Sequence, residues 1–153
     1  MNIAWMYLDK RNATINALKD YESMNYIIEN ARAVIDDTQA IMTGMSSPTI
    51  FDMPKGPHNP HAAENKIIKA MDTTDILHER LRRAQEYMEW FDPAWSALTE
   101  DEQFVLRRFY MYDASKQANS VCEICEHFNL ERSSAYKKKD RALSHLSTLL
   151  YGK

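Results

Sequence analysis

The sequence predicts an all-α protein with a long antiparallel helical hairpin followed by a compact helix-turn-helix. Three observations support this class. The chain has only three glycines in 153 residues and almost no run of alternating β-branched residues of the kind that a half-buried strand needs. Apolar residues recur at heptad spacing over its first part, and helix-capping motifs recur over its last part. We place the hairpin at residues 1–97 and the compact module at residues 98–153.

The two arms of the hairpin are separated by "GMSSPTIFDMPKGPHNP", residues 44–60, which contains four of the five prolines and excludes a helix or a central strand. The second arm holds an a/d pattern for more than four heptads, and the first repeats it less regularly. This seam serves either the core of the hairpin itself or a homodimer. The second-arm positions are Ile67, Thr74, Leu81, Met88 and Trp95 with Ala70, Leu77, Ala84, Phe91 and Leu98; those of the first arm are Tyr7, Thr14, Tyr21, Ile28, Ile35 and Met42 with Ile3, Lys10, Ala17, Met24, Ala31 and Thr38.

Pro93 is expected to kink or end the second arm. Beyond it, Thr99 and Glu102 have the spacing of a capping box, which predicts a helix from Glu100. This helix should bury three apolar residues, Val105, Leu106 and Phe109.

A second capping box is predicted at Ser120 and Glu123, after a turn region "YDASKQANS". The helix that it opens carries an apolar stripe of Val121, Ile124, Cys125 and Phe128. We expect this helix to end at Asn129, which tolerates the left-handed conformation, and Leu130 to be held in the core.

A third helix is predicted to begin near Glu131. Its helical periodicity directs Ala135, Ala142, Leu146 and Leu149 toward the core, and Ser133, Tyr136, Lys137, Asp140 and Ser144 toward solvent. Arg132 lies at the flank of the outer face, and Lys138, Lys139 and Arg141 lie toward its sides.

Charge is distributed unevenly along the chain. The total is −3, yet the stretch from Glu131 to the end has six Lys or Arg against two acids, a net +4, so the remainder carries −7. Such asymmetry predicts a localised anionic partner, although a basic helix face is also often only solvated. For double-stranded DNA as partner, basic and hydroxyl side chains suit base edges and phosphates. The candidate DNA-binding residues are Arg132, Ser133, Ser134, Tyr136, Lys137, Lys138, Lys139 and Arg141.

The stretches "LTEDEQFVLRRFY" and "SVCEICEHFNLERSSAYKKKDRALSHL" resemble region 4 of sigma-70 factors. With the connector "SSPTIFDMPKG", they are similar to small sigma-70 region 4-like regulators of phages and prophages, the ArpU- and RinA-like late regulators. The resemblance implies transcription regulation through promoter DNA and leaves a contact with RNA polymerase open. Lys138 stands where the family has an apolar residue, so its aliphatic stem is expected to lie along the core while its ammonium reaches solvent.

Two other functions remain as alternatives: a DNA-packaging protein similar to the small subunit of a phage terminase, and a helical interaction module that binds no DNA. We expect no enzyme, because the sequence lacks a Gly-rich phosphate loop, a nucleophile elbow and an organised acid-base pair. Cys122 and Cys125, with His127 nearby, lack the further ligands of a zinc site and are interpreted as buried or half-buried thiols. No cofactor is expected. Without a stretch of about 20 apolar residues, the chain is expected to be cytoplasmic, with no membrane partner.

Overall fold

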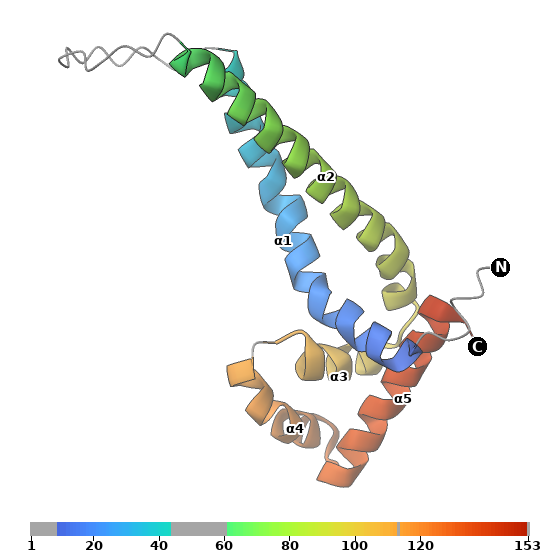
Figure 1. Cartoon of the computed structure of the whole chain (residues 1–153). Helices are drawn as coiled ribbons and strands as arrows, with labels where there is room; N and C mark the ends of the chain where they lie inside the picture. The colour runs from blue at the N-terminus through green and yellow to red at the C-terminus, as the bar shows by residue number, and fades with distance from the viewer. Residues whose placement is uncertain (1–8, 44–60, 113, 153) are drawn as a thin grey trace. The chain divides into compact units, whose positions relative to one another are not determined.

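The computed structural model describes residues 9–43, 61–112 and 114–152, and they form five helices (Figure 1). Their bounds are α1 Lys10–Met42, α2 Ala62–Ser96, α3 Glu100–Tyr110, α4 Ala114–Phe128 and α5 Arg132–Tyr151. No strand occurs among these residues, so the all-α class is confirmed. No described helix is long and apolar enough to cross a membrane. The predicted connector at 44–60 and the heptad positions Ile3 and Tyr7 lie outside the described residues.

The chain divides into two compact units, and the division differs from the predicted boundary at residue 97. Unit 1 combines Met1–Asn25 with Glu86–Lys153, and unit 2 is Tyr26–Gln85. The physical reason is the main hydrophobic core, which contains Leu18 of α1 and Phe91 of α2 together with Leu106 of α3 and Leu146 of α5. The start of α1 and the end of α2 therefore belong to the same folded unit as the last three helices.

Aromatic rings dominate this core where α1 and α2 meet inside unit 1. Phe91 is fully buried, with its ring centroid 5.4 Å from that of Tyr21 and 5.8 Å from that of Trp95. The Tyr87 ring stacks on Phe91 at 5.4 Å, and its hydroxyl donates a hydrogen bond to the Ala17 carbonyl at 2.5 Å. Burial raises the pKa of Tyr87. Each fully buried large apolar side chain contributes about 1.5–3 kcal/mol, so this cluster is a main source of stability.

The last turn of α2 continues past Pro93 to Ser96, so the proline does not end the helix as one prediction allowed. Ala94 and Trp95 are both buried in the core, which holds this turn in helical conformation. The Gln103 side chain then donates a hydrogen bond to the Trp95 carbonyl at 2.9 Å, joining the end of α2 to α3.

In unit 2 the predicted heptad positions whose burial the structure describes are buried or half-buried, except Ile67, which has 43% of its surface exposed. Threonines tolerate the apolar seam because their hydroxyls donate to carbonyls one turn earlier, as Thr74 does to Ala70 at 2.8 Å and Thr38 to Val34 at 2.7 Å. Among the described residues of the unit, those that are buried are Ala31, Ile35, Thr38, Ala70, Thr74 and Ala84.

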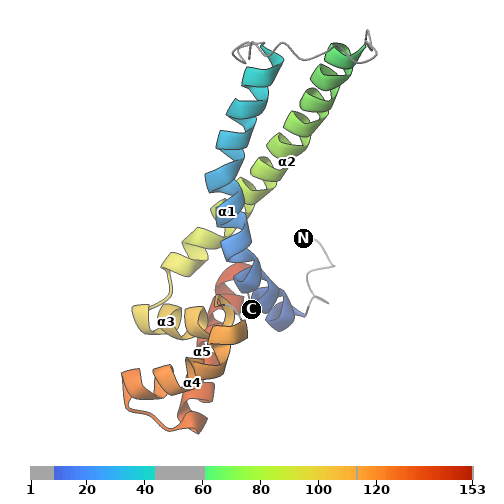
Figure 2. The same ribbon diagram turned by 90° about the vertical axis from the view of Figure 1, so that its left-hand side faces the viewer.

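Helices α3, α4 and α5 pack against one another in unit 1, as both views show (Figures 1 and 2). A second, smaller core lies among them, built on one fully buried residue from each helix: Val105, Ile124 and Ala135. Four aromatic or apolar side chains of α3 and α4 and one thiol surround it, namely Phe104, Phe109, Val121, Phe128 and Cys125. This core fixes the start of α5 on the two helices before it.

Candidate nucleic-acid interface

The first turn of α3 has the predicted capping box. The Glu102 amide donates to the Thr99 hydroxyl at 3.3 Å, and the Thr99 amide donates to the Glu102 carboxylate at 3.0 Å. The second carboxylate oxygen of Glu102 lies 2.9 Å from Nδ1 of His145 on α5. Burial alone raises the pKa of Glu102, but hydrogen bonds from Thr99 and His145 outweigh it, and the net pKa is lowered. This one carboxylate therefore caps α3 and connects it to α5.

The second predicted capping box is wrong. Helix α4 begins at Ala114, so most of the predicted turn region is helical and Ser120 lies inside the helix. Ser120 is 2% exposed and donates to the Arg108 carbonyl at 2.7 Å, while Glu123 pairs with the Arg108 guanidinium at 2.6 Å. Both side chains are thus used by the C-terminal end of α3, which has carbonyls without helical partners. The predicted apolar stripe of α4 is nevertheless buried or half-buried.

The turn between α4 and α5 is closed by the backbone. Asn129 has a φ of 51°, the predicted left-handed conformation, and the Leu130 amide donates to the Cys125 carbonyl at 3.0 Å. This is the six-to-one bond of a Schellman motif. The Leu130 side chain is 36% exposed, so its predicted place in the core is wrong. Ile124 and Ala135 fill the local core instead, and the backbone bond holds the turn.

Helix α5 begins after Glu131, whose side chain makes no capping hydrogen bond. Its buried face comprises Ala135, Ala142, Leu143, Leu146 and Leu150. Leu149, predicted to be buried, is 39% exposed, because the core formed with α1 and α2 turns the second half of the helix toward Leu143 and Leu150.

The outer face of the first half of α5 is exposed as predicted. Tyr136 has 46% of its surface exposed, and Ser134 is half-buried in the first turn. Among the described residues, the cations on this face form no ion pair, although Nη2 of Arg132 lies 3.9 Å from Sγ of Cys122. We call the exposed residues Arg132, Ser133, Tyr136, Lys137 and Arg141 the α5 outer face.

The lysine triplet is divided by its surroundings. Lys137 is exposed, whereas Nζ of Lys138 lies 3.3 Å from Asp101 and 4.1 Å from the centroid of the Phe128 ring. The Lys138 side chain is 31% exposed, and its ammonium, predicted to reach solvent, instead lies over the Phe128 ring and beside Asp101. Lys139 is only 18% exposed, with Nζ 3.6 Å from Asp140 and 5.3 Å from the centroid of the Phe109 ring. Lys138 and Lys139, two of the three lysines predicted to contact DNA, therefore already interact with other side chains of the protein.

Asp140 is also engaged, although it was predicted to face solvent. It is half-buried and accepts a hydrogen bond from Arg11 of α1 at 2.7 Å, which lowers its pKa. Sequence patterns could not indicate this pair, because the partners are 129 residues apart. The same holds for Asp101 and Lys138, which are 37 residues apart.

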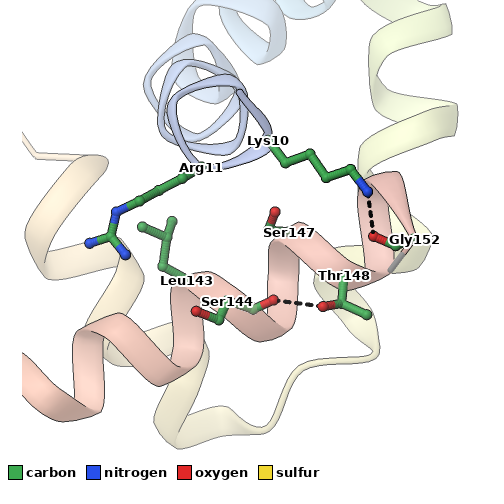
Figure 3. A pocket seen from close by; sticks show the side chains of 7 residues that line it. All are labelled: Lys10, Arg11, Leu143, Ser144, Ser147, Thr148 and Gly152. Atoms are coloured by element: carbon green, nitrogen blue, oxygen red, sulfur yellow. Dashed lines mark hydrogen bonds between the residues drawn. The ribbon is translucent and has the colours of Figure 1, made fainter. Parts of the chain in front are cut away.

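A pocket of about 310 Å³ lies between the start of α1 and the second half of α5 (Figure 3). Lys10 and Arg11 extend over it in different directions, Lys10 donating to the Gly152 carbonyl at 3.2 Å and Arg11 to Asp140. Ser144, Ser147 and Thr148 line its α5 side. Because both cations are already bonded, we do not include this pocket in the α5 outer face.

The two thiols are free, with Cys125 half-buried and Cys122 exposed, so the predicted burial is wrong for Cys122. Cys122 lies on the side of α4 away from the small core, near Arg132. Within the described part of the chain, no three His, Cys, Asp or Glu side chains are grouped so that they could hold a metal ion.

Comparisons of the chain with protein-family models, with curated proteins and with solved structures found no match.

Proposed function

We propose that this chain is a sequence-specific DNA-binding transcription regulator of phage or prophage type. In this proposal α1 and α2 form a long helical hairpin, α3 to α5 form a sigma-70 region 4-like helix-turn-helix, and α5 enters the major groove. The observation that carries the proposal is the α5 outer face, where exposed cations and hydroxyls directly follow a tight turn and form no ion pair with the described residues. A helix presented in this way fits the groove of B-DNA.

The proposed roles follow from chemistry and exposure. Arg132 and Lys137 have the donors for guanine edges, while Ser133 and Tyr136 supply hydroxyls for bases or nearby phosphates. Arg141, one turn further along the same exposed side, suits a phosphate. The buried base of α5 supports these contacts, because Ala135 is fully buried against α3 and α4. Lys138 and Lys139 then position α5 more than they bind DNA.

The experiment is a selection of bound sites from random double-stranded DNA at two salt concentrations. We expect one enriched motif at both, because base contacts specify sequence while phosphate contacts set the salt dependence. The natural chain is compared with a double variant, Arg132→Ala with Lys137→Ala. This variant removes exposed side chains, leaves the cores unchanged and should not enrich the motif. Enrichment of no motif by the natural chain, or of the same motif by this variant, would contradict the proposal.

The engagement of Lys138 by Asp101 and of Lys139 by Asp140 favours one second candidate, an interaction module that binds no DNA. These pairs reduce the positive charge offered by α5. This candidate predicts no retention on DNA at low salt, together with co-purification of RNA polymerase. If the chain binds DNA and RNA polymerase also co-purifies with it, the chain is a DNA-binding regulator with polymerase as a second partner. The mass of the assembly separates both from a terminase-like packaging protein, which would form a ring of many subunits.

A further inference from the structure

The outward side of α2 in unit 2 carries apolar and charged side chains that no described residue covers. Ile76 is 55% exposed and lies in a shallow groove of about 410 Å³ lined by Asp75, Glu79, Arg80 and Arg83. Ile68, two turns earlier, is 49% exposed. Ile68 and Ile76 lie about two turns apart on one side of α2, so the charges around them decide which partner this side fits.

The charges on the two sides of Ile76 differ. Asp72 and Asp75 precede it within one turn, with Lys69 before them, whereas three arginines, Arg80, Arg82 and Arg83, follow it around Glu79. Asp72 and Asp75 are three residues apart, as are Arg80 and Arg83, and neighbours of like sign at this spacing disfavour an isolated helix. The helix dipole does not account for this arrangement, because its effect is confined to the first and last turns of α2.

Ion pairs within α2 satisfy only part of this surface. Glu79 lies 2.8 Å from Arg82 and 2.7 Å from Arg83, and the hydrogen bonds from Arg82 and Arg83 lower the pKa of Glu79 to about 2. Among the described residues, Asp72, Asp75 and Arg80 form no ion pair. The side chain of Arg83 remains 71% exposed, so it has room for another carboxylate. At one end of the surface, Asp72 and Asp75 form no ion pair with the described residues; at the other, Arg80 forms none and Arg83 stays largely exposed.

We propose that this surface binds a second copy of the chain, with α2 packed antiparallel against α2 of the partner. Residues 72 and 83 are about three turns apart and lie on one side of the helix, as do residues 75 and 82 at about two turns. A two-fold axis beside residues 77 and 78 brings Asp72 of each chain opposite Arg83 of the other, and Asp75 close to Arg82. The two Ile76 side chains then lie about 4.5 Å apart along the helix axes, within contact range. A parallel arrangement would instead oppose like charges.

This dimer is independent of the α5 outer face, so it is tested without DNA. Sedimentation velocity of the full chain over a range of concentrations should show a monomer–dimer equilibrium. Arg82→Asp with Arg83→Asp, or Asp72→Arg with Asp75→Arg, should each weaken self-association about tenfold to a hundredfold, because attractive cross-chain pairs become repulsive. Lys19→Asp with Arg32→Asp, at exposed positions of α1, changes the net charge as much as the first variant does and should leave the dimer unchanged.

Mixing the two charge variants gives the decisive arm. The variant with Asp72→Arg and Asp75→Arg is basic at positions 72, 75, 82 and 83, and the variant with Arg82→Asp and Arg83→Asp is acidic at the same four positions. The two variants should therefore associate with each other although neither associates with itself. Circular dichroism checks that both remain helical, and a variant that unfolds is replaced by Ile76→Asp, which should also give monomers. A natural chain that is monomeric at every concentration would overturn the proposal. So would a dimer that survives Arg82→Asp with Arg83→Asp, because a seam made by the a/d positions would tolerate that change.

Discussion

Lys137, Lys138 and Lys139 of α5 can each be replaced by glutamine in separate variants. These variants test the proposed interface because each makes the same substitution at a neighbouring position. Each variant loses one charge within a single helix turn, yet the surroundings differ. Lys137 is exposed without an ion pair to the described residues, whereas Lys138 and Lys139 lie beside Asp101 and Asp140. Only the first should therefore change the electrostatics of DNA binding strongly.

The expected size follows from counterion release. One lysine that neutralises one phosphate contributes about 0.9 to the slope of log K against log salt. Lys137→Gln should therefore reduce the slope by about 0.9, a roughly 3.5-fold smaller change in affinity between about 50 and 200 mM salt. Lys139→Gln should change the slope far less. Lys138→Gln should cost about 0.5–1 kcal/mol of folding stability through its lost ring and carboxylate contacts, while it too has little effect on the slope.

Fluorescence anisotropy measures the slope, using the DNA site obtained from the random selection and at least four salt concentrations. Lys66→Gln, at an exposed position of α2, is the control for a charge change away from α5. Equal slopes for all three α5 variants would refute the division of the lysine triplet. A slope that changes for Lys139→Gln but not for Lys137→Gln would refute the assigned orientation of α5 on DNA.

Three further predictions concern stability. Because the pKa of Glu102 is lowered in the folded chain, its ionised form stabilises the fold above the unfolded pKa, and this contribution is lost as pH falls through the folded value. Glu102→Gln should thus cost about 1 kcal/mol at pH 7 in urea unfolding, with the difference disappearing toward pH 3; a constant difference would contradict the assigned role. Asn129→Ala should cost about 1 kcal/mol and Asn129→Gly little or nothing, since only the first is strained at a φ of 51°; equal thermal shifts would contradict the left-handed turn. Leu146→Ala should cost about 2–5 kcal/mol in the same urea assay, because Leu146 is fully buried, and a loss below 1 kcal/mol would place it outside the core.

Signals confined to a few neighbouring residues predicted local structure correctly. The Thr99 and Glu102 pair gave the start of α3, and Asn129 gave the end of α4 with its left-handed conformation. Such features depend on hydrogen bonds between residues three to five positions apart, so the sequence contains both partners. The exposure of Ser133, Tyr136 and Lys137 followed equally from helical periodicity.

Predictions failed where a distant partner decided the outcome. Ser120 and Glu123 have the spacing of a capping box. Instead, Ser120 donates a hydrogen bond to the Arg108 carbonyl of α3, and Glu123 forms an ion pair with the Arg108 guanidinium. Leu149 fits the core-facing arc of α5, yet the core of unit 1 selects Leu150 instead. The engagement of Lys138 depends on Asp101, which lies thirty-seven residues earlier in the sequence. Periodicity gives the faces of a helix, whereas tertiary packing chooses which face is covered.

The discontinuity of unit 1 has a consequence for how the chain is made. Ala17 and Leu18 are synthesised before Phe91 and Leu146, which complete their core and follow more than seventy residues later. At synthesis rates of about 5–20 residues per second, the sixty residues of unit 2 alone delay that closure by roughly 3–12 s. During this interval Ala17 and Leu18 lack the residues that complete their core. A fragment cut at residue 98 leaves Leu143 and Leu146 without their α1 and α2 partners, and is expected to aggregate where the whole chain folds.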